Sequence, residues 1–172
     1  MVLFETNRLL ARRLTKGDVE SMFAVYGDHE TVRYVGDSVP LDRDGCRRWL
    51  TVTDRNFAQR GYGMFAIVDR ESKETIGFAG IVHPGQSNEP EVKYAFRKDK
   101  WGKGYATEIL KGLVAYAQYS LGLPRLVATV FPENAGSKSV LGKAGFIHSE
   151  DRCDEDQSIT QVWELVQTAS PK

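Results

Sequence analysis

The sequence contains little cysteine and little histidine, and this scarcity excludes several kinds of site. Its 172 residues include only Cys46 and Cys153, and no CxxC pair or Cys/His spacing typical of a zinc site occurs. The three histidines, His29, His83 and His148, are scattered, with no carboxylate or cysteine at metal-binding spacing. We therefore predict no metal site, and this cysteine usage favours a cytoplasmic location.

The chain also lacks an excess of either charge and any long apolar run. It carries 23 basic and 23 acidic residues, so neither nucleic acid nor an anionic membrane is a predicted partner. No segment is long enough to span a bilayer, and an acid followed by arginines stands where a signal peptide needs its apolar core. A chain of this length that is 41% hydrophobic fits one domain, residues 1–172.

Hydrophobic periodicity and turn residues predict seven strands and four helices. The expected strands are 9–13, 62–69, 75–82, 91–96, 126–131, 146–152 and 158–165, and the expected helices are 15–26, 40–60, 106–121 and 134–143. Because a helix connects the fourth strand to the fifth, these two strands are expected to be parallel. The order of elements predicts one α/β (α+β) domain with a mixed, mostly antiparallel sheet.

The strongest local signal is the segment 97–107, between the fourth strand and the longest helix. Gly102 and Gly104 permit a tight turn and leave the first amides of the helix, with its positive dipole end, free to face an anion. Four basic residues against one acid give the segment a net charge of +3: Arg97, Lys98, Lys100 and Lys103 against Asp99. This combination predicts a polyphosphate site, the alternative being a solvated loop in which the glycines only turn the chain.

Two other glycine motifs do not fit the sequence. A dinucleotide fingerprint requires a third small residue where Thr107 stands, and an acid at the end of the next strand, where Val130 and Phe131 stand. A nucleotide-binding P-loop requires Ser or Thr after Gly142-Lys143, but Ala144 follows. A nicotinamide-dependent enzyme is therefore the weakest interpretation of the glycine loop.

Three segments together resemble the GNAT superfamily of N-acetyltransferases, and most closely its branch of ribosomal-protein alanine N-acetyltransferases. They are residues 4–12, residues 101–108, and residues 134–137 followed by 143–146. The resemblance covers nearly the whole chain. It implies a single N-acetyltransferase domain with acetyl-CoA as cofactor, built on a central seven-stranded sheet whose parallel fourth and fifth strands splay apart between four helices.

The resemblance also implies positions for the cofactor. The pantetheine arm would pair with the fourth strand at Tyr94, Ala95 and Phe96, and the phosphates would lie on Trp101, Gly102, Lys103, Gly104, Tyr105, Ala106 and Thr107. In the family the amide at Asn134 holds the pantetheine arm, although an asparagine there is equally a helix N-cap. Lys143 would reach a phosphate, or would only complement the helix dipole.

Acetyl transfer requires a neutral amine, whereas an α-amino group has a pKa near ~8 and a lysine near ~10.4, so a base is expected. Glu91, at the start of the fourth strand, is the candidate, and its rival explanation is a surface ion pair with Lys93. Many family members have a tyrosine in the short helix that acts as the general acid, but this chain has Leu141 and Gly142 there. Ser137 is therefore the candidate acid, its rival explanation being an ordinary first-turn serine.

The sequence leaves the amine acceptor open: a protein N-terminus, as in ribosomal-protein acetylation, or a small molecule. Residues 28–37 are expected to line the acceptor cleft. The last hairpin could attract a cationic amine or could simply be a solvated turn; its charged residues are Glu150, Asp151, Arg152, Asp154, Glu155 and Asp156. The chain is expected to be a monomer or homodimer, and a catalytically silent acyl-CoA-binding regulatory module is the alternative function.

Overall fold

The computed structural model describes residues 1–167 as eight strands, five α-helices and three short 3-10 helices. The strands are β1 (Val2–Glu5), β2 (Leu9–Arg13), β3 (Met64–Asp69), β4 (Thr75–Val82), β5 (Glu91–Phe96), β6 (Arg125–Val130), β7 (Ile147–Cys153) and β8 (Ile159–Val166). The α-helices are α1 (Val19–Tyr26), α2 (His29–Val32), α3 (Arg43–Arg60), α4 (Tyr105–Tyr119) and α5 (Ala135–Lys143). The 3-10 helices are η1 (Lys16–Asp18), η2 (Pro84–Gln86) and η3 (Lys98–Lys100).

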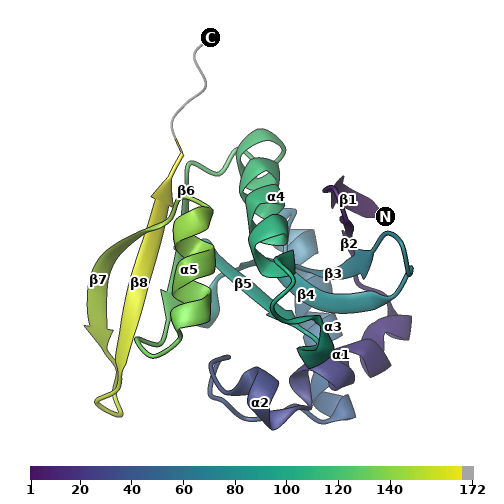
Figure 1. Cartoon of the computed structure of the whole chain (residues 1–172), viewed down its shortest axis with the longest axis horizontal. Coiled ribbons are helices and arrows are strands. Elements are labelled where there is room, and N and C mark those ends of the chain that lie inside the picture. The colour runs from purple at the N-terminus through teal and green to yellow at the C-terminus, as the bar shows by residue number, and fades with distance from the viewer. Residues whose placement is uncertain (168–172) are drawn as a thin grey trace.

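The strands form one mixed sheet in the order β1-β2-β3-β4-β5-β6-β8-β7 (Figure 1). All neighbouring pairs are antiparallel except β5 and β6, which are parallel as predicted. These two strands share one paired position among the described residues, Glu91 with Val127, whereas β4 and β5 share six. The sheet therefore opens between β5 and β6, and the predicted splay is confirmed.

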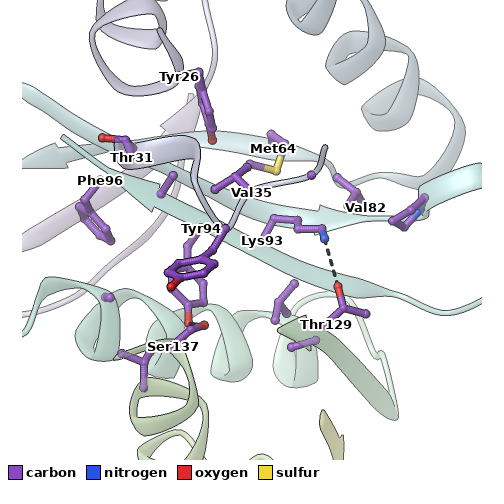
Figure 2. Close-up of a pocket in the computed structure, with 18 of the residues that line it drawn as sticks. Tyr26, Thr31, Val35, Met64, Val82, Lys93, Tyr94, Phe96, Thr129 and Ser137 are labelled. Atoms are coloured by element: carbon purple, nitrogen blue, oxygen red, sulfur yellow. Dashed lines mark hydrogen bonds between the residues drawn. The ribbon is translucent and has the colours of Figure 1, made fainter. Parts of the chain in front are cut away.

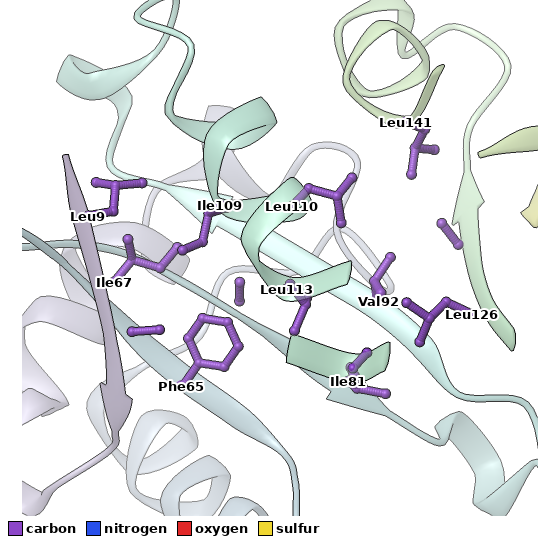
Figure 3. Packing of buried hydrophobic residues seen from close by; sticks show 14 of the residues in the cluster. Leu9, Phe65, Ile67, Ile81, Val92, Ile109, Leu110, Leu113, Leu126 and Leu141 are labelled. Carbon is purple, nitrogen blue, oxygen red and sulfur yellow. The ribbon is translucent and has the colours of Figure 1, made fainter. Parts of the chain in front are cut away.

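Helices cover both faces of the sheet, with α4 and α5 on one face and α1 and α3 on the other (Figure 1). On the first face α4 inserts the apolar stripe that its periodicity predicts, and Ile109, Leu110, Leu113 and Ala117 are at most 1% exposed. Figure 3 shows this stripe packed against side chains of β2, β3 and β5. The buried stripe fixes the axis of α4, and so determines where its amino end lies.

The structure corrects the predicted counts of seven strands and four helices. The additional strand, β1, has only four residues at the edge of the sheet, and both of its end residues are exposed. The additional helix, α2, is a single turn capped by Asp28, whose carboxylate accepts from the Thr31 amide at 2.8 Å. Elements this short do not complete a detectable hydrophobic period, which is why the sequence did not predict them.

Candidate active site

A cavity of about 1350 Å³ lies where β5 and β6 diverge. Side chains from both layers of helices line it, since they include Thr107 at the start of α4. Figure 2 shows two others, Ser137 of α5 and Tyr26 of α1. The opening in the sheet therefore connects its two faces. A ligand held at the α4 end can meet a second ligand that enters from the α1–α3 side.

The amino end of α4 presents main-chain amides to this cavity. Gly102 and Gly104 adopt positive φ angles of 71° and 79°, as the tight turn requires. Among the described residues no side chain caps this helix, and its first turn leaves the amides of Tyr105, Ala106 and Thr107 without intrahelical acceptors. These three residues and both glycines line the cavity, so the predicted anion site has the expected geometry.

The basic residues of the loop are mostly neutralised, which corrects the picture of a positively charged segment. Arg97 pairs with Asp99 at 2.6 Å, Lys98 with Glu30 at 2.5 Å, and Lys100 with Glu74 at 3.8 Å. Of the described residues, Lys103 is not among those that line the cavity, whereas Lys143 on α5 is. The α4 amides and Lys143 are therefore better placed to meet a phosphate in this cavity than the paired loop side chains of Arg97, Lys98 and Lys100.

Arg8, in the connection between β1 and β2, binds the glycine loop and the first turn of α4. The sequence did not predict this role. Its guanidinium donates to the Lys103 carbonyl at 2.9 Å, pairs with the Glu108 carboxylate at 2.7 Å and lies 4.4 Å from the centre of the Tyr105 ring. Glu108 also accepts from the Thr6 hydroxyl at 2.6 Å. Residues 4–12 and 101–108, two of the segments that carry the family resemblance, are thus in direct contact through these hydrogen bonds.

Replacing Glu108 with glutamine tests this clamp, and we expect the free energy of unfolding to fall by about 1.5–3 kcal/mol near neutral pH. Burial alone would raise the pKa of Glu108, but hydrogen bonds from Thr6 and Arg8 outweigh it and hold the pKa below its usual value. The clamp therefore stabilises the fold above the unfolded pKa of about 4.3 and is lost as pH falls through the lower folded pKa. Urea unfolding of both proteins should show the difference at about pH 7 and a much smaller one near pH 3; a gap independent of pH would contradict the assignment.

The open edge of β5 carries further main-chain groups. The Arg97 amide donates to the carbonyl of Ile76 in β4 at 2.9 Å. Since bonding directions alternate along an antiparallel strand, the polar groups of Tyr94 and Phe96 face away from β4, toward the opening. The Trp101 indole donates to the Phe96 carbonyl at 2.9 Å and ties the loop to this edge. All three residues predicted for the pantetheine strand, including Ala95, line the cavity.

Asn134 performs the capping role that the sequence allowed and still faces the cavity. Its Oδ1 accepts from the Ser137 amide at 3.1 Å, so it caps α5. In the part of the chain that the structure describes, its Nδ2 has no hydrogen-bond partner and remains able to donate to a ligand. Capping and ligand binding are therefore compatible functions of one side chain.

A tyrosine reaches Ser137 from the strand side. The Tyr94 hydroxyl lies 2.6 Å from Ser137 Oγ, so β5 and α5 meet across the cavity (Figure 2). Burial raises the pKa of Tyr94, although the hydrogen bond to Ser137 opposes this effect. α5 carries Leu141 and Gly142 where many family members have a tyrosine, but the Tyr94 hydroxyl from β5 reaches Ser137 instead. Sequence spacing places Tyr94 43 residues away and gives no signal of the contact.

Glu91 lies beneath the cavity wall and not on the surface. It is 7% exposed, pairs with Lys93 Nζ at 2.5 Å and accepts a short hydrogen bond from the Thr129 hydroxyl. Lys93 and Thr129 line the cavity, whereas Glu91 is not among the described residues that do. Figure 2 shows Lys93 reaching toward Thr129. The ion pair with Lys93, the rival explanation, is present as a contact, but Glu91 itself is buried, whereas the Lys93 side chain is 34% exposed.

The segment 28–37, which the sequence predicts beside the acceptor, contributes lining residues to the cavity, among them Thr31 and Tyr34. His83 also lines it; its Nδ1 donates to the Ser87 carbonyl at 2.7 Å, and its Nε2 lies 2.8 Å from the Tyr62 hydroxyl. In residues 1–167, the acidic side chains of the β7–β8 hairpin are absent from the lining. That same part of the chain holds no group of three or more potential metal ligands.

Comparison with known proteins identifies this arrangement. Residues 8–147 match the family described as the acetyltransferase (GNAT) domain. The chain belongs to this GNAT family. A Bacillus subtilis (strain 168) relative named "Uncharacterized N-acetyltransferase YoaA" is 32% identical over 146 residues, which are 84% of this chain and 82% of the relative.

Solved GNAT structures share the fold. An acetyltransferase from Agrobacterium tumefaciens str. C58 gives a TM-score of 0.83 at 26% identity, over 97% of this chain and 95% of that chain. RimL, a ribosomal L7/L12 alpha-N-protein acetyltransferase in complex with coenzyme A, gives 0.82 at 15% identity, over 97% and 98%. At such low identity RimL shows the fold alone, so the family is confirmed at the level of GNAT and not of the Rim branch.

The residues fit the cofactor of the family. GNAT acetyltransferases use acetyl-CoA, and the chain is therefore an acetyl-CoA-dependent acyltransferase. The uncapped α4 amides suit the pyrophosphate, and the open edge of β5 suits the amide-rich pantetheine arm.

No helix within residues 1–167 combines the length and apolar character needed to cross a membrane.

Two matched glycine substitutions test the α4 site. Gly102 and Gly122 have similar φ angles of 71° and 66°, and a Cβ at either would meet no described atom within 4 Å, but only Gly102 lines the cavity. Valine at either position costs about 1–2 kcal/mol of backbone strain. We expect acetyl-CoA at about 100 times its Kd to stabilise wild type and Gly122→Val by about 2.7 kcal/mol, and Gly102→Val much less. Thermal unfolding with and without acetyl-CoA measures this; equal ligand shifts in both variants would contradict the site.

Proposed function

We propose that this GNAT protein transfers the acetyl group of acetyl-CoA to a primary amine by direct attack in a ternary complex. The observation that carries the proposal is the single cavity that links the α4 amides to Thr129, Tyr94 and Ser137. The acceptor is either a protein N-terminal α-amino group, which the fold-level likeness to RimL supports, or a small-molecule amine. The free thiols of Cys46 and Cys153 suit a cytoplasmic location.

In this proposal the cofactor is held by main-chain groups at two places. The amides of Tyr105, Ala106 and Thr107 bind the pyrophosphate, with Lys143 beside them, and the main chain of Tyr94 and Phe96 on the side away from β4 pairs with the pantetheine arm. Asn134 Nδ2 donates to the same arm. Acetyl-CoA, when bound, supplies the acetyl group as an activated thioester.

Glu91 is the base in this proposal, and Thr129 connects it to the cavity. The Thr129 hydroxyl already donates to the Glu91 carboxylate. It can accept a proton from the amine at Oγ1 while passing its own proton to Glu91, so that one proton leaves the nitrogen and one arrives at the carboxylate. The Lys93 ammonium, 2.5 Å from Glu91, holds the carboxylate in position.

Ser137 is the acid, supported by Tyr94. Their hydroxyl oxygens are 2.6 Å apart, so a proton given up at Ser137 Oγ can be replaced from the Tyr94 hydroxyl. The Tyr94 hydroxyl is a proton source and not an anion, because burial raises its pKa. The proton goes to the thiolate released in the transfer.

Two-substrate kinetics test direct transfer. With acetyl-CoA and an accepted amine varied together, double-reciprocal plots of initial rate should intersect, because both substrates must be bound before the acetyl group moves. Parallel lines, with acetylated protein isolated in the absence of amine, would indicate a covalent enzyme intermediate and would contradict the proposal.

A further inference from the structure

The acceptor end of the cavity carries positive charge that the protein does not neutralise. Arg55 and Arg60, both on α3, line the cavity. Neither pairs with a carboxylate among the described residues, whereas Arg43, on the same helix, pairs with Glu20 at 2.8 Å. The acidic side chain in the described lining is Glu30, and Lys98 binds it at 2.5 Å. This end is therefore cationic.

The two arginines lie away from the cofactor phosphates. Arg60 is the last residue of α3, and β3 begins a few residues later at Met64. Met64 pairs with Gly80 near the end of β4, and the last residue of β4 pairs with Glu91, the first residue of β5. Arg60 is therefore near the start of β5. The α4 amides lie beyond the other end of β5. Since β5 has six residues, the two ends are separated by roughly 17 Å at ~3.3 Å per residue. Arg60 therefore lies at the end of the cavity opposite the pyrophosphate, and Arg55 lies five residues earlier on the same helix, about 7.5 Å away along its axis.

We infer that the acceptor of this enzyme is an amine that also carries a carboxylate or phosphate, bound by Arg55 and Arg60. The inference rests on the proposed function and names its substrate class. Guanidinium groups bind both anions through two parallel hydrogen bonds, and their fixed positive charge repels a polyamine or a basic peptide. An anionic group at this end places the amine of the same molecule toward Thr129 and the opening between β5 and β6.

Matched acceptors test the substrate class. L-glutamate is compared with L-glutaminamide, O-phosphoserine with serinamide, and the tripeptide amide Ser-Glu-Glu with Ser-Gln-Gln; each pair offers the same α-amine with and without the anion. We expect kcat/KM to favour the anionic member by about tenfold or more, the value of one charge-assisted hydrogen bond. Preference within the amino acids or within the peptides distinguishes a free metabolite from an acidic protein terminus. Equal rates within all pairs, or a preference for the neutral members, would overturn the inference.

Variants on α3 locate the effect. Arg55→Ala and Arg60→Ala should each reduce the preference for the anionic member, through KM, without changing the affinity for acetyl-CoA. Arg48→Ala is the matched control, because Arg48 is exposed on the same helix, has no acidic partner among residues 1–167 and does not line the cavity. Loss of acetyl-CoA affinity in Arg55→Ala or Arg60→Ala would assign these arginines to the cofactor and overturn the inference.

Calorimetry separates this inference from the proposed function. Glutamate, O-phosphoserine and their neutral partners are titrated into protein saturated with coenzyme A, so that no turnover is needed. Binding of the anionic members alone, abolished in the Arg55→Ala/Arg60→Ala double variant, supports the inference even when no amine is acetylated. Absence of binding by every anionic probe would overturn it, whatever the enzyme acetylates.

Discussion

Replacing Glu91 with glutamine lowers kcat by about 10²–10⁴-fold, the usual contribution of a general base, and leaves the affinity for acetyl-CoA close to that of the wild type. The reason is the buried hydrogen bond from Thr129 to Glu91, which connects a carboxylate outside the cavity to a hydroxyl inside it. A glutamine preserves the shape but cannot take up the proton. Steady-state kinetics with a saturating accepted amine give kcat, and calorimetry gives the affinity.

Two further variants distinguish a base from a structural ion pair. Lys93→Gln removes the same ion pair as Glu91→Gln but leaves the carboxylate, and its kcat should fall far less. Thr129→Val keeps the ion pair and removes the hydroxyl link, so its kcat should fall nearly as far as that of Glu91→Gln. If kcat falls equally in Glu91→Gln and Lys93→Gln, and the free energy of unfolding falls equally as well, Glu91 has a purely structural role.

The second large effect concerns the hydroxyl pair of Tyr94 and Ser137. Ser137→Ala removes the group that donates the proton, and we expect kcat to fall by about 10²-fold or more when the leaving thiolate is not protonated. Tyr94→Phe leaves Ser137 in place without its source of protons, 2.6 Å away, and we expect a smaller loss. Rates are measured with saturating acetyl-CoA and amine.

The double variant shows whether the two hydroxyls act as one unit. If they do, Tyr94→Phe/Ser137→Ala is no slower than Ser137→Ala alone, because groups in one proton path are strongly non-additive. Ser139→Ala, on the same helix, is the control; Ser139 is not among the described lining residues, and its rate should match wild type. Independent, multiplying losses in the double variant would mean that the pair is not a proton path.

The features that the sequence predicted well are those with a local pattern. The stripe of Ile109, Leu110, Leu113 and Ala117 repeats with the helical period, and the predicted helix packs as expected. Gly102 and Gly104 signal a turn before a helix because few other residues adopt their φ angles. The parallel arrangement of β5 and β6 follows from the connecting helix, since such crossovers have few alternatives.

The features that the sequence did not predict depend on contacts between distant residues. The +3 charge of the loop is largely cancelled by Glu30 and Glu74, which come from other parts of the chain. The contact of Tyr94 with Ser137 spans 43 residues, and that of Arg8 with Glu108 spans 100. No periodicity reports which polar side chains meet, because many pairings satisfy the same local pattern.

The most direct measurement of the central claim follows one reaction in two ways: thiol released from acetyl-CoA, and acetylated nitrogen on the acceptor identified by mass spectrometry. The panel contains N-terminal peptides, amino acids, aminoglycosides and polyamines. The account predicts that at least one amine gives thiol and N-acetyl product in equal amounts, and that Glu91→Gln slows both together. Tight binding of acetyl-CoA with no N-acetyl product from any amine, or thiol release without it, would contradict the account.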